Sequence, residues 1–198
     1  MCYDHILRMI VTMTSQYFRL IELPEASFGL IGSAIALLGL VTPKVAEYMA
    51  EKNSPTTNML WIAAVTLTAL FGLCGFFPYW GLLFMALVFI GLTFVSFFTS
   101  HYLNKITKSY QRATVLSFKG LAFNLAYGVI GFLFAILISR IRISTQEAHP
   151  LWTKTTIENV SFESAIGWFP WYTIICLAVT AIYCNWKLKG RQEHREAG

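Results

Sequence analysis

The sequence predicts an all-α membrane protein, and its composition is the main reason. Of the 198 residues, 56% are hydrophobic and only 13% are charged, whereas about 25% of an ordinary soluble domain is charged. A water-soluble domain of this size cannot hide so much apolar side chain, because its surface must stay wettable. Aromatic residues make up 16% of the chain, which also suits a lipid bilayer, since aromatic rings collect at membrane interfaces.

Six stretches are apolar enough to cross a bilayer as helices, which takes about 20 residues each. They cover residues 1–20, 26–50, 57–77, 80–103, 112–139 and 166–187. Pro24, Pro55 and Pro78 fall between them, as expected because proline lacks an amide hydrogen and clashes with the preceding helical turn. Residues 140–165 are predicted to form a solvated polar connector with room for a short helix, and residues 188–198 a disordered basic cytoplasmic tail.

Positive charge is distributed unequally between the two ends of the predicted spans. Nine basic residues lie at one end: Lys44, Lys52, Lys105, Lys108, Arg112, Lys187, Lys189, Arg191 and Arg195. Four lie at the other end: Arg19, Arg140, Arg142 and Lys154. Because Lys and Arg accumulate on the cytoplasmic side of a membrane, we expect an integral protein of the cell (inner or plasma) membrane whose N- and C-termini are both cytoplasmic.

Small residues recur along three predicted spans: Gly29, Gly32, Ser33, Ala36 and Gly39 on the second, Gly72 and Gly75 late in the third, and Gly128 and Gly131 on the fifth. Close backbone approach supplies much of the attraction between helices in lipid. We interpret these small residues as helix-packing sites, with sliding of helices during transport as the alternative.

The sequence holds no motif of a soluble enzyme or a metal protein. It has no GxSxG, HExxH or Walker sequence, and its four cysteines form no CxxC pair. The net charge of +5 lies in short gaps between apolar stretches, so it reports membrane orientation rather than nucleic-acid binding. We therefore expect no enzymatic activity, no metal, no cofactor and no nucleic-acid partner.

Ionisable residues inside a membrane span are functional candidates, because a charge in hydrocarbon is costly. The first span carries Asp4, His5, Arg8 and Gln16. Asp4 and Arg8 are four residues apart, so they share a helix face and can pair. Arg8 lies eleven residues before Arg19, about 16 Å from the outer end of the span. These residues form either a cavity wall that attracts an anionic group or a solvated cluster near the cytoplasmic surface.

The fifth span carries two further candidates, Lys119 and Asn124. Lys119 lies seven residues past Arg112, about 10 Å into the membrane, where it can contact a solute or extend along its own stem to the interface. Asn124 lies deeper and either hydrogen-bonds a solute or bridges two helices.

Two stretches resemble a known transporter family. Residues 112–117 (RATVLS) open a long apolar helix that continues through Gly128 and Gly131, and residues 16–17 (QY) precede residues 23–29 (LPEASFG). They resemble the start of the eleventh helix, and the junction of helices seven and eight, in the major facilitator superfamily. The spacing of all six spans resembles helices seven to twelve of that family, so the resemblance covers nearly the whole chain.

The resemblance implies the C-terminal half of a secondary active transporter that moves a small solute across the lipid bilayer by alternating access. Arg8 and Lys119 favour an anionic or zwitterionic solute. The chain is expected to need an N-terminal six-helix half or a second copy, as the product of a split or truncated gene or as a domain fragment. The alternative is a nontransporting six-helix scaffold or assembly subunit, or an inactive remnant of a split transporter gene.

The sequence also departs from the family. The stretch between helices eight and nine of these transporters is often Gly-rich and ends in Asp-Arg with further basic residues. Here residues 39–52 read GLVTPKVAEYMAEK, so the resemblance does not extend to the conformational latch attributed to that motif. Pro43 within this stretch is expected to kink the second span or end it early.

Overall fold

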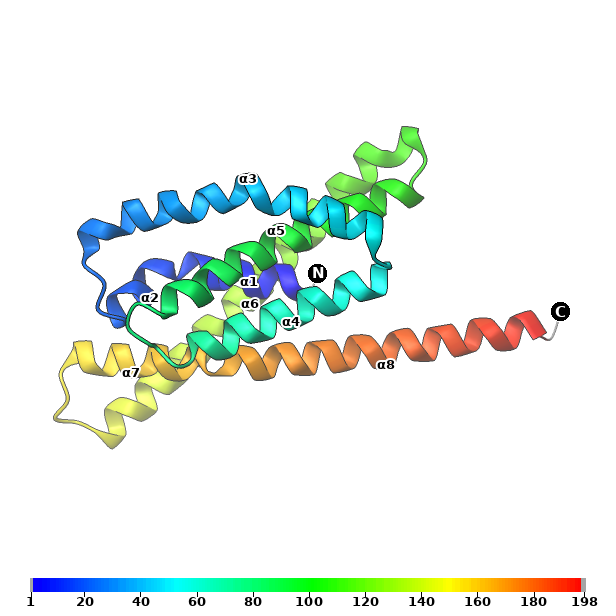
Figure 1. Ribbon diagram of the computed structural model, residues 1–198. Coiled ribbons are helices and arrows are strands. Elements are labelled where there is room, and N and C mark those ends of the chain that lie inside the picture. Colours follow the sequence, from blue (N-terminus) through cyan, green and yellow to red (C-terminus); the bar gives the residue numbers. More distant parts are fainter. Residues whose placement is uncertain (1, 197–198) are drawn as a thin grey trace.

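The computed structural model describes the backbone of residues 2–196 and the side chains of residues 3–187, and every element of regular structure in that part is a helix (Figure 1). The α-helices are α1 (Cys2–Thr12), α2 (Thr14–Leu20), α3 (Phe28–Lys52), α4 (Pro55–Leu73), α5 (Gly81–Ile106), α6 (Arg112–Ala148), α7 (Lys154–Ile166) and α8 (Trp168–Glu196). Two short 3-10 turns, η1 (Glu25–Ser27) and η2 (Ser109–Gln111), precede α3 and α6.

Within the described residues, five helical stretches are long and apolar enough to cross a membrane: Glu25–Lys52, Pro55–Leu73, Gly81–Ile106, Ser109–Ala148 and Lys154–Lys187. They correspond to the second to sixth predicted spans. The first predicted span is helical too, but it is divided into α1 and α2 at Met13. The chain is therefore an all-α protein with the architecture of a membrane protein.

The predicted connector at residues 140–165 does contain a short helix, α7, but most of the stretch is regular helix rather than a solvated loop. Helix α6 continues to Ala148, and α7 leads almost without interruption into α8. The Thr153 Oγ1 atom accepts a hydrogen bond from the Thr156 amide at 3.2 Å and caps the start of α7, which buries Ile157 and Phe162. Helix α8 also runs to Glu196, so the described backbone of the tail is helical rather than disordered.

The helices are roughly aligned, and their junctions gather at two opposite ends of the bundle (Figure 1). The α3–α4 and α5–α6 junctions lie at the end toward which α8 also runs, while the α2–α3, α4–α5 and α6–α7 junctions lie at the other end. This grouping matches the two sides that the charge distribution predicts. Pro43 does not end α3, which stays helical through it and is bowed in Figure 1.

Helix α5 lies at the centre of the bundle, because it packs against α1, α3, α4 and α6. Its side chains Met85, Val88 and Phe98 are fully buried. Gly91 permits the close approach of α1, since a Cβ atom there would lie 3.2 Å from the Cδ1 atom of Leu7.

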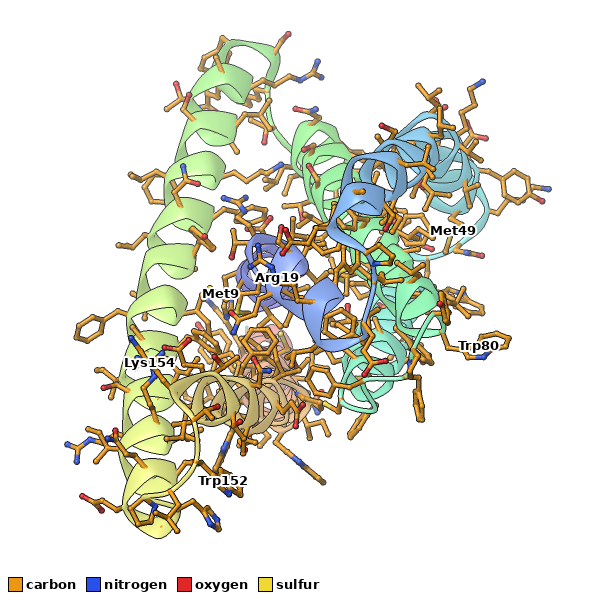
Figure 2. All side chains as sticks on the ribbon, turned by 90° about the vertical axis from the view of Figure 1, so that its left-hand side faces the viewer. Met9, Arg19, Met49, Trp80, Trp152 and Lys154 are labelled. Carbon is orange, nitrogen blue, oxygen red and sulfur yellow. The ribbon has the colours of Figure 1, made fainter. Side chains whose placement is uncertain are left out.

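Helices α3 and α6 are the least buried of the long helices. Their exposed side chains are mostly large and apolar, including Leu37 and Leu40 on α3 and Leu125 and Phe132 on α6. An end-on view shows α6 along one margin of the molecule, with Trp80 projecting outward at the opposite margin (Figure 2). Such surfaces suit contact with lipid or with another membrane-embedded protein.

A buried asparagine fastens the α3–α4 hairpin to α5. The Asn58 Nδ2 atom donates to the Met49 carbonyl oxygen at 3.1 Å and to the Tyr102 hydroxyl at 2.8 Å, and its Oδ1 atom accepts from Asn53. We expect Asn58→Leu to lower the free energy of unfolding by about 2 kcal/mol, because buried partners lose their bonds. Tyr102→Phe should cost less than half as much. Reversible SDS unfolding in mixed micelles measures both, and equal losses would contradict the assignment.

Candidate functional site

The first predicted span is a discontinuous helix. Around Met13 the Thr12 and Thr14 hydroxyls each donate to a carbonyl three residues earlier, at 2.7 Å, and the Met13 amide donates to the Ile10 carbonyl rather than to Met9. Hydroxyl groups that bond the backbone in this way bend helices. No proline or glycine lies in this stretch, so sequence gave no signal of the break. Discontinuous membrane helices often line solute sites.

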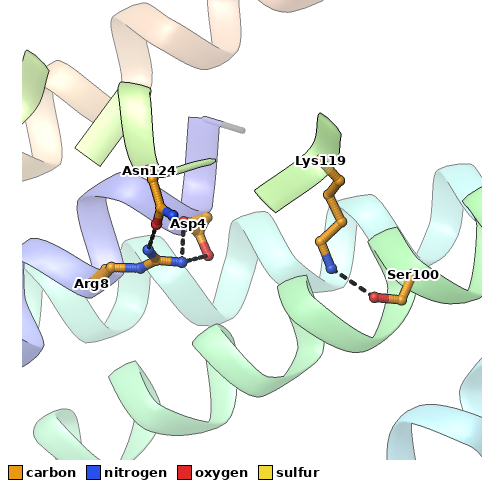
Figure 3. A network of polar contacts seen from close by, with 5 residues as sticks. All are labelled: Asp4, Arg8, Ser100, Lys119 and Asn124. Atoms are coloured by element: carbon orange, nitrogen blue, oxygen red, sulfur yellow. Dashed lines mark hydrogen bonds and ion pairs between the residues drawn. The ribbon is translucent and has the colours of Figure 1, made fainter. Parts of the chain in front are cut away.

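A salt bridge between two residues of α1 lies beside the neighbouring helix α6. The Arg8 Nη2 atom donates to the Asp4 Oδ1 atom at 3.1 Å and lies 3.0 Å from the Asp4 Oδ2 atom. The Arg8 Nη1 atom donates to the Asn124 Oδ1 atom at 2.8 Å, so one guanidinium joins α1 to α6 (Figure 3). The guanidinium carbon also lies 5.6 Å from the centre of the Tyr127 ring. The three predicted candidates Asp4, Arg8 and Asn124 therefore form one cluster.

The two charged members of this cluster differ in exposure. The Asp4 side chain is only 3% exposed, whereas the Arg8 side chain is 32% exposed. The Asp4 Oδ2 atom is buried and accepts no hydrogen bond from any residue that the structure describes. The cluster thus has a buried carboxylate next to a partly exposed guanidinium. Arg8 can donate hydrogen bonds to an additional anionic group while it stays paired with Asp4.

Lys119 forms a second polar contact nearby. Its Nζ atom donates to the Ser100 Oγ atom at 2.7 Å and so joins α6 to α5 (Figure 3). The same Nζ atom lies 5.3 Å from the centre of the Phe123 ring. The ammonium group is thus held by α5, and the two predicted alternatives for Lys119, contact with a solute or extension to the interface, stay predictions.

His5 and Gln16 lie outside the Arg8 cluster. The His5 Nε2 atom is 3.1 Å from the Tyr172 hydroxyl, and the two rings meet edge to face, which ties α1 to α8. Gln16 is half-buried on α2 and makes no side-chain hydrogen bond within the described part of the chain. The structure thus gives His5 a helix-bracing contact, and within the described residues it gives Gln16 no hydrogen bond to the other candidates.

The contacts of Lys119 with Ser100 and of His5 with Tyr172 could not be predicted from the sequence. Neither Ser100 nor Tyr172 carries a charge, and each lies in an apolar stretch, so hydropathy gives no signal. Their roles depend on which helices are neighbours, and that information comes only from the packing of α1, α5, α6 and α8.

Comparison with protein-family models, with curated proteins and with solved structures finds no match to this chain.

Proposed function

We propose that this chain is one six-helix half of a secondary active transporter of the major facilitator type. It moves a small anionic or zwitterionic solute by alternating access once a second six-helix unit completes the cavity. The membrane is the cell (inner or plasma) membrane, and both termini face the cytoplasm. The second unit is an N-terminal half or a second copy of this chain.

The observation that carries the proposal is the partly exposed Arg8 guanidinium between Asp4 and Asn124. Arg8 lies four residues before α1 ends at Thr12, and α2 continues the first span to Leu20. The guanidinium is therefore inside the predicted span, where charged groups pair with one another and mark solute pathways in membrane proteins. The break at Met13, one and a half turns further along, supports the same interpretation.

A second observation supports the need for a partner unit. A Cβ atom added at Gly29, Gly32 or Gly39 on α3, or at Gly120, Gly128 or Gly131 on α6, would meet no atom within 4 Å. The glycines on α3 and α6, including those predicted to pack helices together, therefore face outward from this chain, whereas Gly72 on α4, also predicted as a packing site, lies against the Phe84 ring. Close packing of a helix on these faces of α3 and α6 requires a helix from another protein unit.

The test is uptake of a panel of labelled metabolites into proteoliposomes. We expect no uptake by the chain present as one copy per functional unit, and uptake of an anionic or zwitterionic metabolite when a candidate N-terminal half or a fused second copy is supplied. In the active assembly, Arg8→Ala should lower uptake at least about 100-fold, because a charge-assisted contact to the solute is lost. Arg19→Ala is the control, since Arg19 pairs with Glu25 at the exposed surface.

Three outcomes would contradict the proposal. Uptake by the single isolated chain would show that no partner unit is needed. Unchanged uptake with Arg8→Ala would remove Arg8 from the solute path. Absence of uptake by every assembly would favour a nontransporting scaffold subunit or an inactive remnant.

A further inference from the structure

A polar cleft lies between α3 and α5, beside the Lys119–Ser100 contact. It has a volume of about 530 Å³, and its walls include Pro43 and Glu47 from α3 and Ser100 and His101 from α5. Proline within a helix removes one backbone hydrogen bond and bends the helix, and α3 is bowed in Figure 1. Pro43 itself lines the cleft, at the part of α3 that faces α5.

Several polar side chains in this cleft have no polar partner. Glu47, His101 and Asn104 make no side-chain hydrogen bond or ion pair with any residue in the described ranges. The His101 ring is held in place by the Phe97 ring, which stacks on it at 5.8 Å. Free donors and acceptors gathered in one cleft, with Glu47 exposed and His101 and Asn104 partly exposed, are available to a polar occupant, which can replace the water that otherwise bonds them.

The cleft lies nearer one end of the bundle than Arg8 does. Glu47 lies five residues before the end of α3 at Lys52, and His101 lies five residues before the end of α5 at Ile106. Five residues correspond to about 7.5 Å of helix. Both helices end on the side predicted to be cytoplasmic, so the cleft lies close to that side.

The charges around the cleft have opposite signs on its two walls. Glu47 supplies a carboxylate on α3. On the opposite wall, Ser100 accepts a hydrogen bond from the Lys119 ammonium group at 2.7 Å, which brings a positive charge to the edge of the cleft. The Phe97 ring and Pro43 add apolar surface between the polar groups.

We infer that this cleft binds a small zwitterion of the amino acid class with an apolar side chain. Its ammonium group pairs with Glu47, its carboxylate group lies toward Lys119 and Asn104, and its side chain contacts Phe97. The inference rests on the proposed function, for which it names the solute class and a binding site on the predicted cytoplasmic side. Binding is measured without transport, so the two can fail separately.

The test is equilibrium binding to the full chain in lipid nanodiscs, with three probes of one shape. L-leucine carries both charges, isoamylamine lacks the carboxylate, and 4-methylpentanoate lacks the ammonium group. We expect leucine to bind most tightly. Glu47→Gln should weaken leucine and isoamylamine binding at least about tenfold, because a charge-assisted bond is lost, and should leave 4-methylpentanoate unchanged. Glu51→Gln, one turn further along α3 and outside the cleft walls, is the matched control and should bind as the original chain does.

Lys119→Met should show the opposite selectivity, weakening leucine and 4-methylpentanoate and sparing isoamylamine. Absence of leucine binding to the original chain, or equal leucine affinity with Glu47→Gln, would overturn the inference. Leucine binding that Glu47→Gln weakens, together with no uptake by any assembly, would support this cleft and reject the proposed transporter. Uptake by an assembly, together with leucine binding that Glu47→Gln leaves unchanged, would support the proposed transporter and reject this cleft as the binding site.

Discussion

Replacing Arg8 by methionine is expected to lower the free energy of unfolding by about 3 kcal/mol. The Asp4 carboxylate is 3% exposed, and its described partner is Arg8. Removing one member of a buried ion pair leaves the other charged and desolvated, which is strongly destabilising. SDS unfolding in mixed micelles measures the change.

A double variant separates the loss of the pair from the loss of one partner. Asp4→Leu together with Arg8→Met should recover most of the stability, because an apolar pair of similar volume carries no desolvation penalty. Arg19→Met is the matched control. The Arg19 and Glu25 side chains are 61% and 68% exposed, so their ion pair contributes no more than about 1 kcal/mol. Equal effects of Arg8→Met and Arg19→Met would show that Asp4 is solvated, as the alternative interpretation of the first span holds.

The hydrophobic cores of the spans could be predicted from sequence, whereas several of their ends could not. The predicted span 80–103 and the observed α5 differ by a few residues, because proline and polar residues flank an apolar stretch. Helix α6 continues nine residues beyond the predicted end at 139. Hydropathy marks where hydrocarbon ends, but a helix continues into the interface as long as its backbone hydrogen bonds are satisfied. Here the helix ends one residue before His149, just ahead of Pro150.

The candidate site could be predicted only in part, because the spacing of residues along one helix does not show which other helices it contacts. Spacing along one helix placed Asp4 and Arg8 on one face, and the structure confirms that they pair. The contact from Arg8 to Asn124 joins residues 116 positions apart, and periodicity within one helix carries no information about it. Glu47 was missed as a site residue because its position near the predicted end of a span resembles that of an ordinary interfacial charge.

The glycines that were predicted to pack helices together have different surroundings on different helices of this chain. The sequence predicted helix packing at Gly72 as well as at Gly128 and Gly131, and the structure has open space at Gly128 and Gly131. At Gly72, by contrast, a Cβ atom would overlap the Phe84 ring of α5, so a small residue is required within the chain. Glycine on α4 thus permits a helix contact within the chain, whereas glycine on α6 lies on a face that no other described part of the chain covers. The outward face is the one that a partner unit must cover if the proposed function is correct.

Substituting leucine for Gly128 should therefore leave the isolated chain intact and disrupt its assembly. The free energy of unfolding should change by less than about 1 kcal/mol, because the new side chain enters open space. Gly91→Leu, whose Cβ atom would press on Leu7 at 3.2 Å, should cost about 2 kcal/mol or more. Helix association in lipid depends on close backbone approach, so we expect Gly128→Leu to weaken association with the second six-helix unit at least about tenfold.

Energy transfer between labelled units in vesicles measures this association, both with a second copy and with a candidate N-terminal half. Val129→Leu is the control, because residue 129 lies about 100° further round α6 and is itself an exposed apolar position. It should leave association unchanged. Loss of stability in the isolated Gly128→Leu chain would mean that the glycine face packs internally. Unchanged association with either partner would mean that lipid covers this face, and it would remove the evidence for a second six-helix unit.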